Sequence, residues 1–171
     1  MHVSTDVRLL SLPTIESLGA SHDRAPESHR QLVIIRVEDD DGCHGWGECS
    51  ALNRPTYTAE WSDGAFEQLT TGNTNDVGPM AAAGREMAHT DLMLRRDGRS
   101  LAASLGVACP TVPAGAAVGL MPVAELSDRV DSLVATGFGR IKVKIQPGHD
   151  VGPIEAIVDR HPDLDLHVDA N

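Results

Sequence analysis

The stretch Gly139-Arg140-Ile141-Lys142-Val143-Lys144-Ile145 decides the fold, because its side chains alternate between apolar and cationic. On a β-strand, successive side chains point to opposite faces, so the apolar residues share one face and the two lysines share the other. Of the 14 cationic side chains in the sequence only these two are lysine, and the rest are arginine. Lysine can lose its proton when it is desolvated, whereas arginine effectively cannot. The pair therefore indicates lysine chemistry on one face of a strand.

The residues around this strand predict a parallel sheet. An apolar run over 113–120 is typical of a strand buried on both faces, and residues 123–136 favour an amphipathic helix. After the lysine strand, a helix is expected over 151–160 and a last strand over 164–171. Alternating strands and helices with short connections are typical of parallel βα units.

Polar groups lie at the ends of these strands, where parallel βα units carry their reactive residues. Lys142 and Lys144 end one strand, and Asp169 and Asn171 end the next. A desolvated lysine beside a second cation can act as a general base, and a carboxylate suits a hard cation such as Mg²⁺. The alternative is a solvated strand face with a surface ion pair. His167 shares the face of Asp169 but lies deeper, which predicts a core histidine.

Residues 1–111 predict an antiparallel α+β domain, followed by an α/β domain over 112–171. In the first of these domains, strands are expected over 3–12, 31–38 and 43–49, and helices are expected to begin at 59, 79 and 100. Asp39 to Gly42 form the predicted hairpin turn, and Thr58 is the predicted cap of the first helix. The glycines between Cys43 and Cys49 indicate close backbone packing or a bulge.

Composition excludes several classes of protein. A formal charge of −11 argues against nucleic-acid and anionic-membrane partners, and no apolar run is long enough to span a bilayer. The N-terminus lacks the plan of a signal peptide, and the three cysteines fit no zinc spacing. We therefore expect free thiols and a cytoplasmic protein.

Several motifs together resemble the enolase superfamily, in its muconate-lactonising-enzyme subgroup. The nearest match is the family of o-succinylbenzoate synthases and N-succinylamino acid racemases. The matching segments are Arg140 to Gly148 with Asp150, Val168-Asp169-Ala170-Asn171, Gly45-Trp46-Gly47-Glu48-Cys49, Pro55-Thr56-Tyr57-Thr58, and Gly98 to Leu101 with Pro113 to Gly115. The lysine strand with the Asp-x-Asn strand is the specific part of this resemblance.

The resemblance implies an α+β capping domain followed by the start of a TIM-like α/β barrel, truncated after about three strands of the eight. Lys144 would be the acid/base group, and Lys142 would ease its loss of a proton and help hold the substrate carboxylate. Asp169 would be the first ligand of Mg²⁺, with Mn²⁺ as an alternative, and Asn171 would lie beside the site.

Two loops of the first domain would close over the substrate in this family. They are the segment around Leu18 and Gly19 and the segment from Leu52 to Tyr57. The family often has an aromatic residue where this chain has Leu18, a departure that bears on the identity of the substrate.

The implied reaction is a metal-assisted dehydration by a carbon–oxygen lyase resembling o-succinylbenzoate synthase of menaquinone biosynthesis. A racemase or cycloisomerase of the same superfamily, or a catalytically dead interaction module, remains as an alternative. The family needs further acidic ligands and a second lysine from later strands, and a full barrel takes about 250 residues. We therefore expect a fragment or a split protein that is inactive alone. Its partners would be a small carboxylate substrate and the missing barrel half, and homo-oligomerisation is left open.

Overall fold

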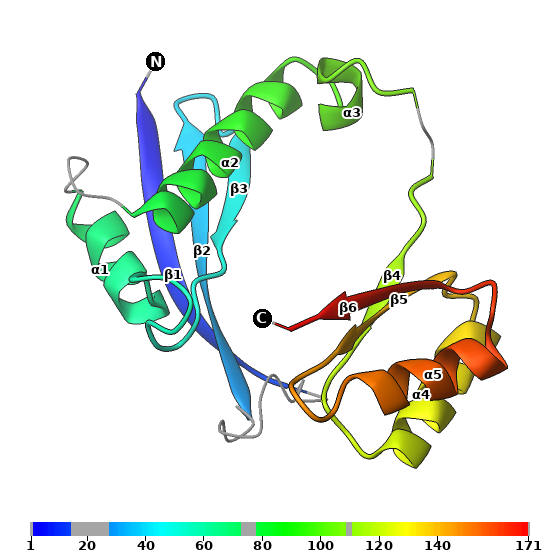
Figure 1. The fold of residues 1–171 in the computed structure, drawn as a ribbon. Coiled ribbons are helices and arrows are strands. Elements are labelled where there is room, and N and C mark those ends of the chain that lie inside the picture. Colours follow the sequence, from blue (N-terminus) through cyan, green and yellow to red (C-terminus); the bar gives the residue numbers. More distant parts are fainter. Residues whose placement is uncertain (1, 15–27, 73–77, 109–110, 171) are drawn as a thin grey trace. The chain divides into compact units, whose positions relative to one another are not determined.

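The structure is a computed structural model that describes residues 2–14, 28–72, 78–108 and 111–170. The described residues up to Ala108 form one compact unit, and those from Thr111 onward form a second. Each unit is built on its own three-stranded sheet (Figure 1). Among the described residues, no helix has the length and apolar character needed to cross a membrane.

The first unit contains the predicted antiparallel sheet, with strand order β1-β2-β3. Its strands are β1 (Val3–Pro13), β2 (His29–Asp39) and β3 (His44–Cys49). The predicted turn between β2 and β3 is confirmed, since Asp39 N donates to Cys43 O at 3.0 Å and Gly42 has a φ of 81°. A positive φ is open to glycine because it has no Cβ.

Two helices cover one face of this sheet. They are α1 (Ser62–Thr71) and α2 (Pro79–Arg96), and a short helix α3 (Leu101–Ser104) follows. Val33, Ile35 and Val37 alternate along β2 toward these helices, and none of the three is accessible to solvent. The period of two in β2 thus supplies the apolar face that the helices need.

The predicted start of the first helix is wrong. α1 begins at Ser62 with Trp61 as its N-cap, and the Thr58 hydroxyl donates to Glu60 O at 3.4 Å instead of capping a helix. Ser62 is buried; its backbone N donates to Leu52 O at 2.9 Å and its hydroxyl to Gln31 Oε1 at 2.5 Å. Contacts with distant residues therefore set this helix boundary.

The glycines of β3 allow α2 to lie directly on the strand, which confirms the predicted close packing. A Cβ added at Gly47 would lie 1.9 Å from Gly84 O, and one at Gly45 would lie 2.2 Å from Ala88 O. Both distances are far below van der Waals contact, and both partners are backbone atoms of the helix. Helix and strand are therefore in contact through their main chains.

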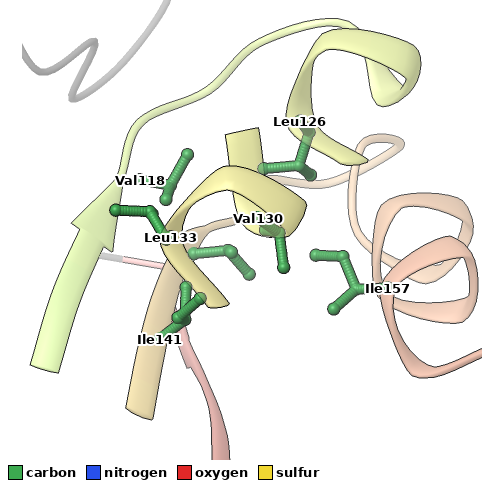
Figure 2. Packing of buried hydrophobic residues seen from close by; sticks show 7 residues of the cluster. Val118, Leu126, Val130, Leu133, Ile141 and Ile157 are labelled. Atoms are coloured by element: carbon green, nitrogen blue, oxygen red, sulfur yellow. The ribbon is translucent and has the colours of Figure 1, made fainter. Parts of the chain in front are cut away.

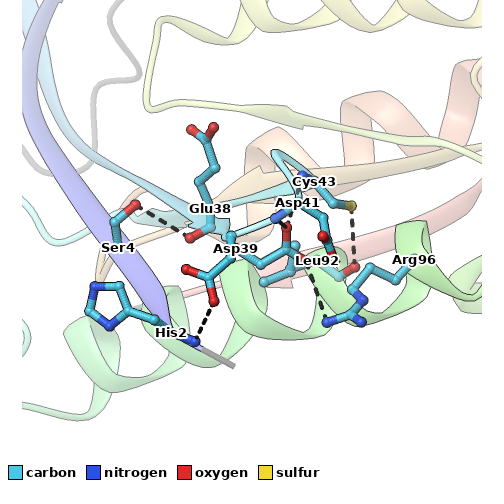
Figure 3. A network of polar contacts seen from close by, with 9 residues as sticks. His2, Ser4, Glu38, Asp39, Asp41, Cys43, Leu92 and Arg96 are labelled. Carbon is cyan, nitrogen blue, oxygen red and sulfur yellow. Dashed lines mark hydrogen bonds and ion pairs between the residues drawn. The ribbon is translucent and has the colours of Figure 1, made fainter.

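A buried carboxylate ties the β2–β3 turn to the end of α2 (Figure 3). Asp39 Oδ1 accepts hydrogen bonds from the backbone N of Asp41 and of Cys43, each at 3.0 Å. Its other oxygen forms no hydrogen bond but lies 3.4 Å from Arg96 Nη1. The cation at the helix end thus compensates a charge that would be costly to bury alone.

The second unit contains a parallel sheet with strand order β4-β5-β6. Its strands are β4 (Gly115–Val118), β5 (Arg140–Lys144) and β6 (Asp165–Asp169). The crossovers are α4 (Val123–Ala135) and α5 (Val151–Arg160), as the sequence pattern predicts. Gly137, with a φ of 101°, follows α4 and lets the chain return to β5.

The core of this unit lies between α4, α5 and one face of the sheet (Figure 2). Its buried members are Val118, Leu126, Val130, Leu133, Ile141, Val143 and Ile157. The expectation that the first parallel strand is buried on both faces is wrong here, because Gly115 and Ala117 are exposed. In the described residues, the helices cover one face of the sheet only.

The opposite face of the sheet carries a column of charged and polar pairs from β5 and β6. The register places Arg140 beside Asp165, Lys142 beside His167, and Lys144 beside Asp169. At the N-terminal ends of the two strands, Arg140 Nε donates to Asp165 Oδ2 at 2.6 Å, and His167 Nε2 lies 3.0 Å from Asp165 Oδ1. The prediction of a core histidine is wrong for His167, whose side chain is half-exposed.

The Arg140 hydrogen bond, followed by that of His167, holds the pKa of Asp165 below its usual 3.8. A lowered pKa stabilises the folded state above the ordinary value, and this contribution is lost as the pH falls through the lowered one. We expect the stability of residues 111–170 to fall less steeply in Asp165→Asn than in the parent protein as the pH drops below about 4. Urea unfolding followed by the Val143 methyl resonances measures this, with Asp163→Asn as the control for losing one carboxylate. An unchanged pH dependence in D165N would contradict the assignment.

We expect Gly47→Ala to lower the free energy of unfolding of the first unit by roughly 1–3 kcal/mol or more, because its Cβ meets helix backbone. Both tryptophans, Trp46 and Trp61, belong to this unit, so their fluorescence during urea unfolding reports on it alone. Gly45→Ala is the companion variant in the same unit and should be destabilised likewise, since a Cβ there would lie 2.2 Å from Ala88 O. Equal stability of G47A and the parent protein would show that the helix can move away freely.

Candidate active site

The candidate site lies where β5 and β6 end. Lys142 Nζ and Lys144 Nζ each lie 2.9 Å from the same oxygen, Asp169 Oδ2. Ile145 N donates to Asp169 O at 3.0 Å, which extends the pairing of the two strands to this edge. The structure therefore brings three of the predicted site residues together.

The apolar side of β5 determines where the lysines point. Ile141 and Val143 are fully buried in the core, and this fixes the rotation of the strand about its axis. Because neighbouring side chains alternate, Lys142 and Lys144 must emerge on the opposite face. The parallel register with β6 then sets Asp169 directly beside Lys144.

The two lysines differ in their exposure to solvent. The Lys144 side chain is 18% exposed, the Lys142 side chain is 47% exposed, and Asp169 lies between them at 23%. Lys144 is therefore the more enclosed amine, and enclosure is what favours proton transfer by a lysine. Two ammonium groups against one carboxylate leave a surplus of positive charge, which suits an anionic ligand.

The metal-ligand set is incomplete in the part of the chain that the structure describes. Asp169 offers the hard carboxylate oxygen that Mg²⁺ prefers. Among the described residues, however, no three His, Cys, Asp or Glu side chains form a group that could hold a metal ion. Asp169 therefore fits as one ligand, while the described residues do not form a whole site.

The other predicted site residues are not brought to this edge within the second unit. Leu52 and Tyr57 belong to the first unit, where Leu52 is half-buried and Tyr57 is 60% exposed. Leu18, Gly19 and Asn171 lie outside the described residues. Their roles in substrate binding stay predictions.

Sequence reasoning missed the side chains that hold the base of the loop containing Leu52 and Tyr57. Asn53 contacts the backbone of β2 twice, Ser62 is bound to Gln31, and Glu60 accepts hydrogen bonds from the start of α2. A single asparagine or glutamate in a polar loop carries no periodic signal. Only the spatial partners of these residues distinguish them from solvated loop residues.

A separate hollow of about 500 Å³ lies on the first unit, between β3, α2 and α3. Trp46, Met87, Leu94 and Leu101 form its apolar lining, with Glu86 and Asp91 among its polar residues. None of the predicted site residues that the structure describes lines it. It is therefore distinct from the lysine and aspartate cluster.

The chain resembles known proteins over most of its length. No family model matches the chain. The o-succinylbenzoate synthase of Bacillus subtilis is 35% identical in an alignment of 162 positions, gaps included, which covers 83% of this chain and 44% of that protein. The N-succinylamino acid racemase of an Amycolatopsis species is 34% identical in an alignment of 188 positions, gaps included, which covers 97% of this chain and 50% of that protein.

A solved structure gives the same result. The probable mandelate racemase of Alicyclobacillus acidocaldarius superposes with a TM-score of 0.86 at 31% identity, covering 99% of this chain and 51% of that one. The chain thus spans about half the length of the relatives that it matches. Its antiparallel unit corresponds to a capping domain, and its parallel unit to the first three strands of a barrel. The chain matches the N-terminal part of the o-succinylbenzoate synthase and N-succinylamino acid racemase family of the enolase superfamily.

Proposed function

We propose that this chain is the N-terminal part of a Mg²⁺-dependent dehydratase resembling o-succinylbenzoate synthase, a hydro-lyase of menaquinone biosynthesis. The observation that carries the proposal is the pair of lysine amines, each 2.9 Å from Asp169 Oδ2 at the ends of β5 and β6. Enolase-superfamily sites combine a lysine or histidine base with Mg²⁺. This cluster offers two lysines and one carboxylate that suits such a metal. The domains we propose are residues 1–111 and 112–171.

Lys144 is the proposed acid/base group. As a neutral amine it takes the proton from the carbon next to the substrate carboxylate, and as an ammonium it returns a proton to the departing oxygen. Its low exposure supports this role, because the proton would be transferred at a position largely screened from water. Lys142 is more exposed, and its proposed role is to hold the carboxylate of the substrate.

Asp169 is the proposed first ligand of the metal. When bound, Mg²⁺ supplies positive charge that stabilises the enolate formed by proton removal. The described residues offer one carboxylate to it, so the remaining ligands come from other parts of the completed barrel. We therefore propose that the chain is inactive alone and that its main partner is the rest of that barrel, in the cytoplasm.

Racemisation of N-succinylamino acids is the second candidate function. The Amycolatopsis racemase matches 97% of the chain, against 83% for the Bacillus subtilis synthase, at nearly equal identity. Both reactions begin with removal of a proton next to a carboxylate, so Lys144 serves either one. They differ in what happens next, and product analysis with each substrate separates them.

We expect the two lysines to respond differently to substitution in a completed barrel, made by joining residues 1–171 to the C-terminal half of the Bacillus subtilis synthase. Lys144→Ala and Lys144→Arg should both lower exchange of the substrate α-proton with solvent deuterium by about 10²–10⁴-fold. Lys142→Arg should retain most activity, because its charge suffices, while Lys142→Ala slows the reaction without abolishing it. Nuclear magnetic resonance of the substrate in deuterium oxide measures this exchange. Wild-type exchange in K144R would rule out Lys144 as the proton-transferring group.

We expect residues 1–171 alone to show no submicromolar Mg²⁺ binding, because one carboxylate cannot hold the ion tightly. The completed barrel should bind Mg²⁺ and lose this binding on Asp169→Asn, as measured by titration calorimetry. Asp165→Asn is the matched control, since it removes the same charge from the same strand face. Tight binding by the isolated chain, or equal losses in both variants, would disprove the assigned role of Asp169.

A further inference from the structure

The edge of β2 extends beyond the end of β3. The last paired residues are Val33 and Cys49, so β3 does not cover the backbone groups of β2 at Gln31 and His29. Asn53 covers both of them with its side chain. Its Oδ1 accepts from Gln31 N at 2.9 Å, and its Nδ2 donates to His29 O at 2.9 Å. The Asn53 carboxamide therefore makes the two hydrogen bonds that the backbone of β3 would make if it continued along β2.

The same glutamine also holds the other end of the loop. Gln31 Oε1 accepts from the Ser62 hydroxyl at 2.5 Å, and Ser62 N donates to Leu52 O at 2.9 Å. Ser62 is fully buried, so these bonds form away from solvent. Gln31 thus connects the outgoing residue Asn53 to the returning residue Ser62.

A third contact fixes the returning chain at Glu60. Its carboxylate accepts from Met80 N at 3.0 and 2.9 Å and from Ala81 N at 3.2 Å, at the start of α2. The residue before that helix is Gly78, which has no side chain to act as a cap, and a Cβ there would lie 2.2 Å from Glu60 Oε1. An anion at a helix N-terminus is stabilised by the free N–H groups and the helix dipole.

Between these fixed ends, residues 54–59 are all exposed, and Tyr57 is 60% exposed. We propose that Asn53 is a positioning residue, which together with Gln31, Ser62 and Glu60 presets residues 54–59 for contact with the substrate. This inference rests on the proposed function and on the predicted contact of Tyr57 with the substrate. A preset loop loses less conformational entropy when substrate binds, so the effect falls on substrate affinity and not on the chemical step.

The test uses Asn53→Ala and Asn53→Asp, of which the second keeps the acceptor for Gln31 N but loses the donor to His29 O. In residues 1–171, we expect N53A to increase the rate of hydrogen exchange at the Gln31 amide and the rate of chymotryptic cleavage after Tyr57. Both rates should be intermediate in N53D. In the completed barrel, we expect KM to rise on the order of tenfold while kcat changes little, as loss of substrate binding predicts.

Val37→Ala is the control for general destabilisation, because it opens the core of the same sheet without touching the loop. It should lower the stability of the first unit and leave cleavage after Tyr57 and KM unchanged. Wild-type cleavage and exchange in N53A would overturn the holding role of Asn53. Wild-type KM in an active N53A barrel would overturn its positioning role. An inactive parent barrel would refute the proposed function and the substrate role with it, while cleavage and exchange still decide whether Asn53 holds the loop.

Discussion

Burial of Ile141 and Val143 under α4 and α5 is the constraint on which the site depends. A strand with one fully buried face has a single allowed rotation, and a shift by one residue would bury both lysines. The apolar face of β5 therefore orients Lys142 and Lys144 as strictly as any contact that they make themselves. Asp169 reaches them because β6 is held in register by the same parallel sheet.

Close contact plays the corresponding role in the first unit. Because Gly45 and Gly47 have no side chains, the backbone of α2 lies directly on β3, and the helix start is brought to where Glu60 can cap it. The loop that carries Tyr57 is then fixed between β2 and α2. The glycines of the strand and the polar residues at the base of the loop thus act together to hold an exposed segment in place.

Periodic features could be predicted from the sequence, and non-periodic ones could not. The alternation in β5 predicted both the strand and the grouping of Lys142, Lys144 and Asp169, because the period of a strand determines its faces. The start of α1 was misplaced because buried contacts of Ser62 override the local capping preference of Thr58. His167 was misjudged because parity gives the face of a residue, but not whether other elements cover that face. The sequence did not indicate the role of Asn53, since its hydrogen-bond partners on β2 lie more than twenty positions away along the chain.

The charge distribution connects the composition to the proposed substrate. The chain as a whole carries −11, yet the cluster at the ends of β5 and β6 contains two ammonium groups and one carboxylate. At physiological ionic strength, exposed charges more than about 8 Å apart are largely screened, so the local surplus outweighs the distant acidic residues. An anionic ligand would therefore be attracted to this cluster even though the protein is acidic. In the proposed mechanism the two amines have different roles, because holding a carboxylate requires a lasting charge and moving a proton requires a charge that can be lost. Arginine could serve only the first purpose, which gives a physical reason for lysine at position 144 in a chain that otherwise uses arginine.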